Sequence, residues 1–340
     1  MRAFVVSAPR TAAVEDVAAP VPGPLDLLVD VERVGICGTD VELYSGEMAY
    51  LDQGISTFPL RLGHEWTGIV VGAGAQASGD WIGKRVTGDT MLGCGRCRFC
   101  LGGHQHVCPD RFEVGIQDGW AGALAEQVLV PQRFAHEIPN SVSVTSAALV
   151  EPGGNALRAV DAASLAPGQP LLILGSGTIG LLAAQFALAR GLDVHIAGQR
   201  PGSLELARQL GVRHTWQLDA IESAGIPFAA VIDATSLVEA PALAVRLVDP
   251  AGRVVFIGLS GTPSLVDSRD IALKDVTAVG ILSASPGLVG AIELFASGAV
   301  VADTIVSEVI GLSDVADRLE GRRGPAAGAG PKVHVDPRLP

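Results

Sequence analysis

Four cysteines lie close together in one short stretch of the 340-residue chain. Their spacing is Cys94-x2-Cys97-x2-Cys100-x7-Cys108. Four thiolates this close satisfy the tetrahedral shell of Zn²⁺ and leave no open position, which is typical of a structural zinc site. An iron–sulfur cluster is the alternative, but the ferredoxin run places its last cysteine after three residues rather than seven. The spacing therefore favours a structural zinc lobe at residues 94–108.

Three further places in the sequence carry side chains that zinc accepts: Cys37, the adjacent pair His64 and Glu65, and Glu151. Taken singly each is unremarkable, because a lone cysteine is usually a small buried hydrophobe and a lone glutamate is usually solvated. Together they offer one thiolate, one imidazole and carboxylates, which suits a catalytic zinc with an open position. Their separation along the chain is too large for spacing alone to bring them together.

A glycine-rich motif of the form G-x-G-x-x-G follows a predicted strand and begins a predicted helix. Its residues are Gly175, Ser176, Gly177, Thr178, Ile179 and Gly180. In this context the glycines permit a tight turn, close approach of the backbone to a pyrophosphate and close packing of the helix on the sheet. The N–H groups at the helix N-terminus then attract the anion. A glycine-rich turn that binds nothing is the alternative, since the motif alone is a weak signal.

The segment after the next predicted strand bears on the choice of cofactor. NAD-binding proteins keep an acidic residue here, which binds the ribose 2′-hydroxyl and would repel a 2′-phosphate. In this chain the segment is Gly198-Gln199-Arg200, so the carboxylate is missing and a guanidinium follows that can bind a phosphate. A solvated loop arginine is the alternative for Arg200. We predict NADP(H) in preference to NAD(H).

The elements that must position these residues fall into two kinds. Short strand-like runs between glycine and proline turns fill the first part of the chain, which predicts a mostly antiparallel unit. After about residue 150, apolar runs of about five residues alternate with helical segments, as in a parallel sheet covered on both faces. We therefore predict an α/β fold with a mostly-β unit over 1–150, a doubly wound nucleotide-binding sheet over 151–285 and a return to the first unit over 286–340.

Composition excludes some classes of partner. Hydrophobic residues make up 48% of the chain and charged residues 18%, and the net charge is −12, so we expect neither nucleic acid nor an anionic membrane as a partner. The apolar stretch 171–189 is broken by glycines and is expected to be a strand, turn and helix rather than a membrane span. The N-terminus shows no signal peptide, and five cysteines are poor material for disulfides, so we expect a cytoplasmic protein.

Taken in order along the chain, these motifs resemble those of the zinc-containing medium-chain dehydrogenase/reductase superfamily, the alcohol dehydrogenase superfamily. The resemblance extends over essentially the whole sequence and is closest to the polyol, butanediol and threonine dehydrogenase branch, which has a glutamate at the position of Glu151. It implies a GroES-like catalytic domain, a Rossmann domain and an active site in the cleft between them. It also implies a homodimer or homotetramer.

The resemblance further implies individual roles. Cys37, His64 and Glu151 would bind the catalytic zinc, Glu65 would be an alternative or fourth ligand that exchanges with water or substrate, and Thr39 would relay the alcohol proton. The four clustered cysteines fall on the structural zinc positions, and Gly198-Gln199-Arg200 is similar to the Gly-x-Arg stretch of NADP-dependent members. Two departures leave the substrate open: Glu42 stands where polyol dehydrogenases often have histidine, and Gly153-Gly154-Asn155 stands where the family has bulkier apolar residues.

We therefore expect an oxidoreductase with two zinc ions per chain that transfers a hydride between NADP(H) and a secondary alcohol or ketone. The small-molecule substrate would be a polyol, cyclitol, sugar or amino alcohol. A zinc-independent quinone or enoyl reductase of the same architecture is one alternative, but it would not need Cys37, His64 and Glu151 together. A non-enzymatic NADPH-binding protein is another alternative, but such a protein would have no use for a set of catalytic zinc ligands.

Overall fold

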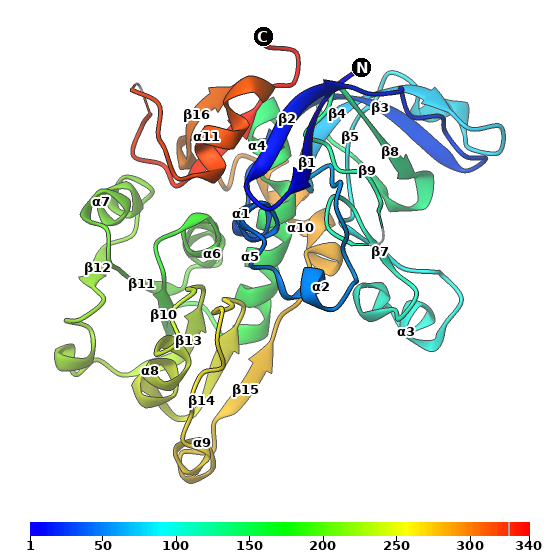
Figure 1. Ribbon diagram of the computed structural model, residues 1–340. Coiled ribbons are helices and arrows are strands. Elements are labelled where there is room, and N and C mark those ends of the chain that lie inside the picture. The colour runs from blue at the N-terminus through cyan, green and yellow to red at the C-terminus, as the bar shows by residue number, and fades with distance from the viewer. Residues whose placement is uncertain (118, 326) are drawn as a thin grey trace. The chain divides into compact units, whose positions relative to one another are not determined.

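The computed structural model describes residues 1–117, 119–325 and 327–340 and divides the chain into two compact units. Each unit has its own sheet and its own hydrophobic core (Figure 1). Unit 1 comprises Met1–Glu151, Ala302–Gly328 and Lys332–Pro340, and unit 2 comprises Pro152–Val301 and Ala329–Pro331.

The main sheet of unit 1 is antiparallel except for one parallel pair at its edge. Its strands, in spatial order, are β16 (Val306–Ile310), β17 (Lys332–Val335), β3 (Asp26–Gly35), β4 (Glu65–Ala73), β5 (Arg85–Gly88) and β9 (Ala135–Glu137), with β8 (Gln127–Pro131) paired to β3. Two small sheets accompany it: β1 (Arg2–Ala8) with β2 (Thr11–Asp16), and β6 (Met91–Leu92) with β7 (Phe112–Glu113). The prediction of a mostly antiparallel unit is confirmed.

Strand β3 shows how the sequence builds this sheet. Leu27, Val29 and Val31 alternate with more exposed residues and fill the core, as expected for a strand with one buried face. The pairing register with β4 shifts between Val31 and Arg33, and the next buried side chain is Val34. This bulge changes the phase of the alternation and leads the chain towards Cys37.

Short helices connect the strands of unit 1. They are α1 (Gly38–Ser45), α2 (Ala49–Asp52), α3 (Arg98–Leu101), α4 (Val144–Ala148) and α11 (Val315–Leu319). Helix α5 (Val150–Ala163) begins in unit 1 and continues in unit 2. The sequence analysis does not predict α5, because Gly153 and Gly154 lie in its first turns and glycine is a poor helix former.

Unit 2 contains a fully parallel sheet. Its strands, in spatial order, are β12 (His214–Gln217), β11 (Asp193–Gly198), β10 (Pro170–Leu174), β13 (Phe228–Asp233), β14 (Val248–Phe256) and β15 (Thr277–Gly280). The helices between them are α6 (Thr178–Ala189), α7 (Pro201–Gln209), α8 (Ala240–Leu247) and α9 (Ser268–Leu273), and α10 (Leu288–Ala296) follows the last strand. The chain leaves β10 in one direction to β11 and β12, and then continues on the other side from β13, which is the doubly wound order predicted from the sequence.

The structure moves one predicted boundary. Residues 286–301, which the sequence analysis assigns to the return segment, group with unit 2. The reason is the apolar face of α10, where Phe295 is buried and its ring lies 5.9 Å from that of Phe186 in α6. Gly153 of α5 also lies against Phe295, so α10 packs on two helices of unit 2. The apolar stretch 171–189 forms β10, a turn and α6, and within the described residues no helix combines the length and apolarity needed to cross a membrane.

Candidate functional site

The four clustered cysteines converge in space. The sulfur atoms of Cys94, Cys97, Cys100 and Cys108 all lie within 4.8 Å of one another. The Cys97 sulfur lies 3.6 Å from that of Cys100 and 3.7 Å from that of Cys108, and the cysteines are not disulfide-bonded. Zinc–sulfur bonds of about 2.3 Å in a tetrahedron place the sulfur atoms about 3.8 Å apart. The donor set therefore fits a closed tetrahedral zinc site.

Within this lobe, the backbone favours the thiolate form of Cys94, whereas burial raises the pKa of Cys100 to about 12. Hydrogen bonds from the backbone N–H groups of Arg96 and Cys97 lower the pKa of Cys94 to about 6. The guanidinium of Arg133 donates to the carbonyl oxygens of Gly93, at 2.6 Å, and Cys94, at 3.5 Å. It thereby ties the start of the lobe to the segment that follows β8.

A second set of zinc-type donors converges from two separate segments of unit 1. One ligand atom each of Cys37, His64 and Glu65 lies within 4.8 Å of the others. Cys37 precedes α1, and His64 and Glu65 lie at the start of β4. Nδ1 of the buried His64 lies 3.6 Å from Oδ1 of Asp40, which leaves Nε2 as the ring nitrogen available to a metal ion.

The carboxylate of Asp40 fixes these two segments to one another. One oxygen accepts a hydrogen bond from the backbone N–H of Cys37 at 2.8 Å, and the other accepts one from the backbone N–H of Gly63 at 3.1 Å. Burial opposes ionisation of Asp40, but His64 and these N–H donors outweigh it and lower its pKa. Burial also acts to lower the pKa of His64, but Asp40 and Cys37 outweigh it and raise that pKa well above its usual value. The Asp40 carboxylate beside the ring therefore orients the imidazole, as a carboxylate next to a metal-binding histidine does.

Glu65 is already engaged in a buried ion pair. Its two carboxylate oxygens lie 2.8 and 2.6 Å from Nζ of Lys332 in β17, and Lys332 also donates to the carbonyl oxygen of Ile36 at 2.8 Å. Burial disfavours the ammonium, but Glu65 outweighs it and raises the pKa of Lys332. A side chain at Gly35 would collide with the Glu65 carboxylate, so glycine is required beside it. No motif in the sequence indicates Lys332.

Glu151 and Thr39 lie at the margins of this group. Glu151 is buried and stands outside the group of three, but Thr90 links it to His64: the Thr90 hydroxyl lies 3.4 Å from Oε1 of Glu151 and 3.5 Å from the carbonyl oxygen of His64. Thr39 is half-buried in the first turn of α1, two residues after Cys37. Thr90 follows β5 without a motif of its own, so no sequence signal identified it.

In unit 2, two cavities follow the carboxyl ends of the parallel strands. One of about 250 Å³ lies at the ends of β10 and β11, and one of about 410 Å³ lies beyond β13 and β14. Thr235 and Leu237 line both, so the cavities adjoin. An extended ligand across the carboxyl ends at the point where strand order reverses is the binding mode of doubly wound sheets.

The glycine-rich turn borders the first cavity. Gly175, Ser176 and Gly177 line it, whereas Thr178, Ile179 and Gly180 form the first turn of α6 and do not. Gly175 has φ +103°, which favours glycine, and a side chain at Gly180 would collide with the Gly175 carbonyl oxygen. Gly175 and Gly180 are therefore required by the geometry of the turn, whereas a Cβ at Gly177 would meet open space.

Gly198, Gln199 and Arg200 line the same cavity. A side chain at Gly198 would collide with the Ser176 hydroxyl, so an acidic residue has no room there. Arg200 precedes α7, and Ser203 in the first turn of that helix also borders the cavity. The sequence analysis missed Ser203 because a serine in a helical segment carries no motif.

Comparison with known proteins agrees with both halves of this description. Residues 23–140 match the alcohol dehydrogenase GroES-like domain, and residues 178–297 match the zinc-binding dehydrogenase domain. L-threonine 3-dehydrogenase of Colwellia psychrerythraea is 30% identical over 279 residues, which cover 76% of this chain and 77% of that protein. The chain belongs to the zinc-containing medium-chain dehydrogenase/reductase superfamily.

Solved structures of the superfamily show the same fold. A zinc-binding dehydrogenase from Sinorhizobium meliloti 1021, solved with NADP, has a TM-score of 0.90 and 33% identity, with 99% of each chain covered. Alcohol dehydrogenase TADH from Thermus sp. ATN1 has a TM-score of 0.88 and 27% identity, again with 99% of each chain covered. As a member of this superfamily the protein is an alcohol dehydrogenase-type oxidoreductase that uses zinc and a nicotinamide cofactor.

A third group of potential ligands in this dehydrogenase is unsuited to a metal. Asp193, His195 and His214 approach one another on β11 and β12. The indole N–H of Trp216 donates to Nδ1 of His195 at 3.2 Å, so a neutral His195 carries its proton on Nε2 and has no free lone pair there. The rings of His195 and His214 are also stacked, 4.3 Å apart and 14° from parallel, so their in-plane lone pairs cannot converge on one ion.

Proposed function

We propose that the protein is a zinc-dependent dehydrogenase that transfers a hydride between NADP(H) and a secondary alcohol or the corresponding ketone. The observation that carries this proposal is the approach of Cys37, His64 and Glu65 to within 4.8 Å of one another. A thiolate, an imidazole and a carboxylate form the donor set of a catalytic rather than a structural zinc. The relatives named L-threonine 3-dehydrogenase support a small hydroxylated substrate, which we expect to be a polyol, cyclitol, sugar or amino alcohol.

In this proposal Cys37 and His64 hold the catalytic zinc together with Glu151, which lies outside the group of three in this structure but is joined to His64 through the Thr90 hydroxyl. Zinc, when bound, acts as a Lewis acid that lowers the pKa of an alcohol and polarises a ketone. Asp40 holds the ligand-bearing segments together through the backbone of Cys37 and Gly63. Glu65 is the alternative ligand, and its ion pair with Lys332 favours water or substrate at the fourth position, because ligation by Glu65 requires the pair to loosen.

The proton released from the alcohol is proposed to pass through the hydroxyl of Thr39. Both oxygens of the neighbouring Asp40 already accept backbone hydrogen bonds, so Asp40 is poorly placed to carry the proton onward. Glu42 lies exposed on the same helix and is the better outlet. Partial desolvation and the neighbouring Glu47 carboxylate raise its pKa.

The preference for NADP(H) rests on three positions around the first cavity of unit 2. Gly198 has no room for the acidic side chain that NAD-specific proteins use. Arg200 and Ser203 supply a guanidinium and a hydroxyl beside the same cavity, and both can bind a phosphate. The NADP-bound relative supports the same preference.

Metal analysis and a cofactor-resolved substrate panel test the proposal. Purified protein should contain two zinc ions per chain, one in the four-cysteine lobe and one at Cys37, and should oxidise NADPH faster than NADH with a ketone. Protein with one zinc or none that reduces quinones or enoyl compounds instead would overturn it in favour of a zinc-independent reductase. Cofactor binding without turnover of any ketone or alcohol would favour a non-enzymatic role.

We also propose that the protein is a homodimer or homotetramer. Strand β15 ends the described sheet of unit 2, and the segment between β14 and β15 carries large exposed apolar side chains: Leu259, Leu265 and Leu273 are 80%, 91% and 86% exposed. Exposed apolar groups of this size favour a covering partner, and a second copy of the chain is the simplest one. Light scattering coupled to size-exclusion chromatography measures the mass, and a monomer at micromolar concentration would contradict the proposal.

A further inference from the structure

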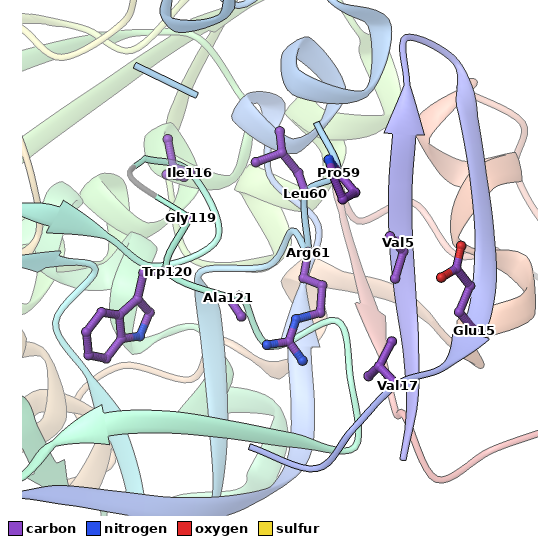
Figure 2. Close-up of a pocket in the computed structure, with 10 residues that line it drawn as sticks. All are labelled: Val5, Glu15, Val17, Pro59, Leu60, Arg61, Ile116, Gly119, Trp120 and Ala121. Atoms are coloured by element: carbon purple, nitrogen blue, oxygen red, sulfur yellow. The ribbon is translucent and has the colours of Figure 1, made fainter. Parts of the chain in front are cut away.

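A cavity of about 290 Å³ in unit 1 has no part in the chemistry described above. It lies between the β1–β2 hairpin, the segment 59–61 before β4, and a loop that contributes Ile116 and residues 119–121 (Figure 2). None of the candidate zinc ligands, nor Thr39, lines it. Its volume approaches the lower end of the range for small-molecule sites in proteins.

Most of the lining is apolar. Val5, Leu60 and Ile116 are buried core residues whose side chains border the cavity. Trp120 closes one side, and its indole N–H donates to the carbonyl oxygen of Leu129 at 3.3 Å, which fixes the ring. A ligand that fills this space must therefore present an apolar body of a few carbon atoms.

The guanidinium of Arg61 is the one cationic group of the lining. Figure 2 shows it between Trp120 and the hairpin residue Val17. Arg61 is about half-buried, and burial lowers its pKa with no neighbouring acid acting in the opposite direction. In the part of the chain that the structure describes, its guanidinium makes no hydrogen bond or ion pair. A partly desolvated charge without a partner is costly, and an anionic ligand would relieve that cost.

Two further observations limit the chemical class of the ligand. A second cavity of about 260 Å³ is bordered by the same Arg61 and Trp120, so open space adjoins this arginine in both cavities. Glu15 also borders the first cavity without pairing to Arg61, and it disfavours a ligand of high negative charge. A phosphate would carry close to two charges and require several donors, whereas one guanidinium matches one carboxylate in a bidentate pair.

We propose that this cavity binds a small carboxylate with an apolar body. The carboxylate pairs with Arg61, and the apolar part packs against Val5, Leu60 and Ile116 beside the Trp120 ring. The ligand class is that of short aryl- or branched-alkyl carboxylic acids. This inference does not depend on the proposed dehydrogenase reaction.

Isothermal titration calorimetry of the full-length, zinc-loaded protein with 3-phenylpropionate tests the proposal. We expect saturable binding of one molecule per chain. Arg61→Gln should weaken it roughly ten- to hundredfold, as expected for the loss of a charge-assisted pair. The uncharged analogue 3-phenylpropionamide should bind wild type as poorly as the acid binds the variant. Arg208→Gln, which removes an exposed arginine from α7 in unit 2, is the matched control and should bind normally.

A carboxylate can also bind a catalytic zinc. A variant of the zinc site therefore distinguishes binding in the Arg61 cavity from binding at the metal. Cys37→Ser should retain binding of 3-phenylpropionate, since Cys37 does not line the cavity. The proposal is overturned if wild type shows no saturable binding at millimolar concentrations, if Arg61→Gln binds normally, or if Cys37→Ser abolishes binding. If Arg61→Gln fails to fold, the affinities of wild type for 3-phenylpropionate and 3-phenylpropionamide decide between the outcomes. Equal affinities would refute a role for the charge of the ligand.

Discussion

Nζ of Lys332 lies 2.8 and 2.6 Å from the two carboxylate oxygens of Glu65, and both side chains are almost fully buried. Removing one member of such a pair leaves an uncompensated charge in the protein interior, which costs about 3–5 kcal/mol. We expect Lys332→Met to lower the free energy of unfolding by about that amount. Urea denaturation at neutral pH measures the change.

The double variant Glu65→Gln/Lys332→Met provides the control for this prediction. It removes both charges, so its loss of stability should be clearly smaller than the sum of the two single losses. Additive losses would show that the two groups do not depend on one another. Lys332→Arg keeps the charge and should be the mildest of the substitutions.

Substitutions at the two zinc centres should have the same effect on zinc content but different effects on stability. Cys97→Ser removes one thiolate from a lobe with few buried apolar residues, so it should lose one zinc and unfold more easily. Cys37→Ser should also lose one zinc but retain the folded state, because Asp40 still links the backbone segments of unit 1. Zinc analysis by mass spectrometry and thermal unfolding measure the two effects. Turnover should disappear in Cys37→Ser, and wild-type activity in a zinc-depleted His64→Ala protein would contradict the mechanism.

Cofactor choice should respond to single substitutions at Arg200 and Gly198. Arg200→Gln removes the guanidinium beside the first cavity of unit 2, and we expect the KM for NADPH to rise roughly tenfold or more while the KM for NADH changes little. Gly198→Asp adds a negative charge and a collision with the Ser176 hydroxyl, so it should impair NADPH more than NADH. Equal effects of Arg200→Gln on both cofactors would assign the arginine to a general structural role.

Structural features that depend only on residues close together in the sequence are the ones that can be predicted well. The glycine-rich turn and the four-cysteine lobe are local patterns, and the six residues and four cysteines lie where those patterns require. The ion pair of Glu65 with Lys332 joins residues 267 positions apart, so no spacing rule could indicate it. Thr90 and Ser203 were missed for the related reason that a single hydroxyl acquires its role only from the surrounding fold.

Helix α5 illustrates a different limit. Its glycines look unfavourable for a helix by local propensity, yet they allow close packing. A side chain at Gly154 would lie 2.8 Å from the carbonyl oxygen of Ala284, and one at Gly153 would press against Phe295 of α10. Tertiary contact therefore selects glycine where local propensity argues against it. The same contacts place 286–301 in unit 2, contrary to the boundary drawn from the sequence.

His334 in β17 should make the stability of unit 1 depend on pH. Its side chain is fully buried, and neither ring nitrogen has a hydrogen-bond partner among the described residues. Burial, together with the charges of Lys332 and Arg33, holds the pKa of His334 well below its usual value. The imidazole therefore stays neutral in the folded protein at pH values where an unfolded chain, with a histidine pKa of about 6.5, binds a proton.

Because the folded pKa is the lower one, stability is retained above about pH 6.5 and falls as the pH drops below it. The slope from this one group is at most about 1.4 kcal/mol per pH unit, so no more than about 2 kcal/mol is lost between pH 6.5 and pH 5. His334→Leu fills the site without a titratable group and should lose correspondingly less stability over that interval. Urea denaturation at pH 7, 6 and 5 measures the difference, with His214→Leu at an exposed position as the control for removing an imidazole. Parallel pH profiles for wild type and His334→Leu would mean that His334 is not held neutral in the folded protein.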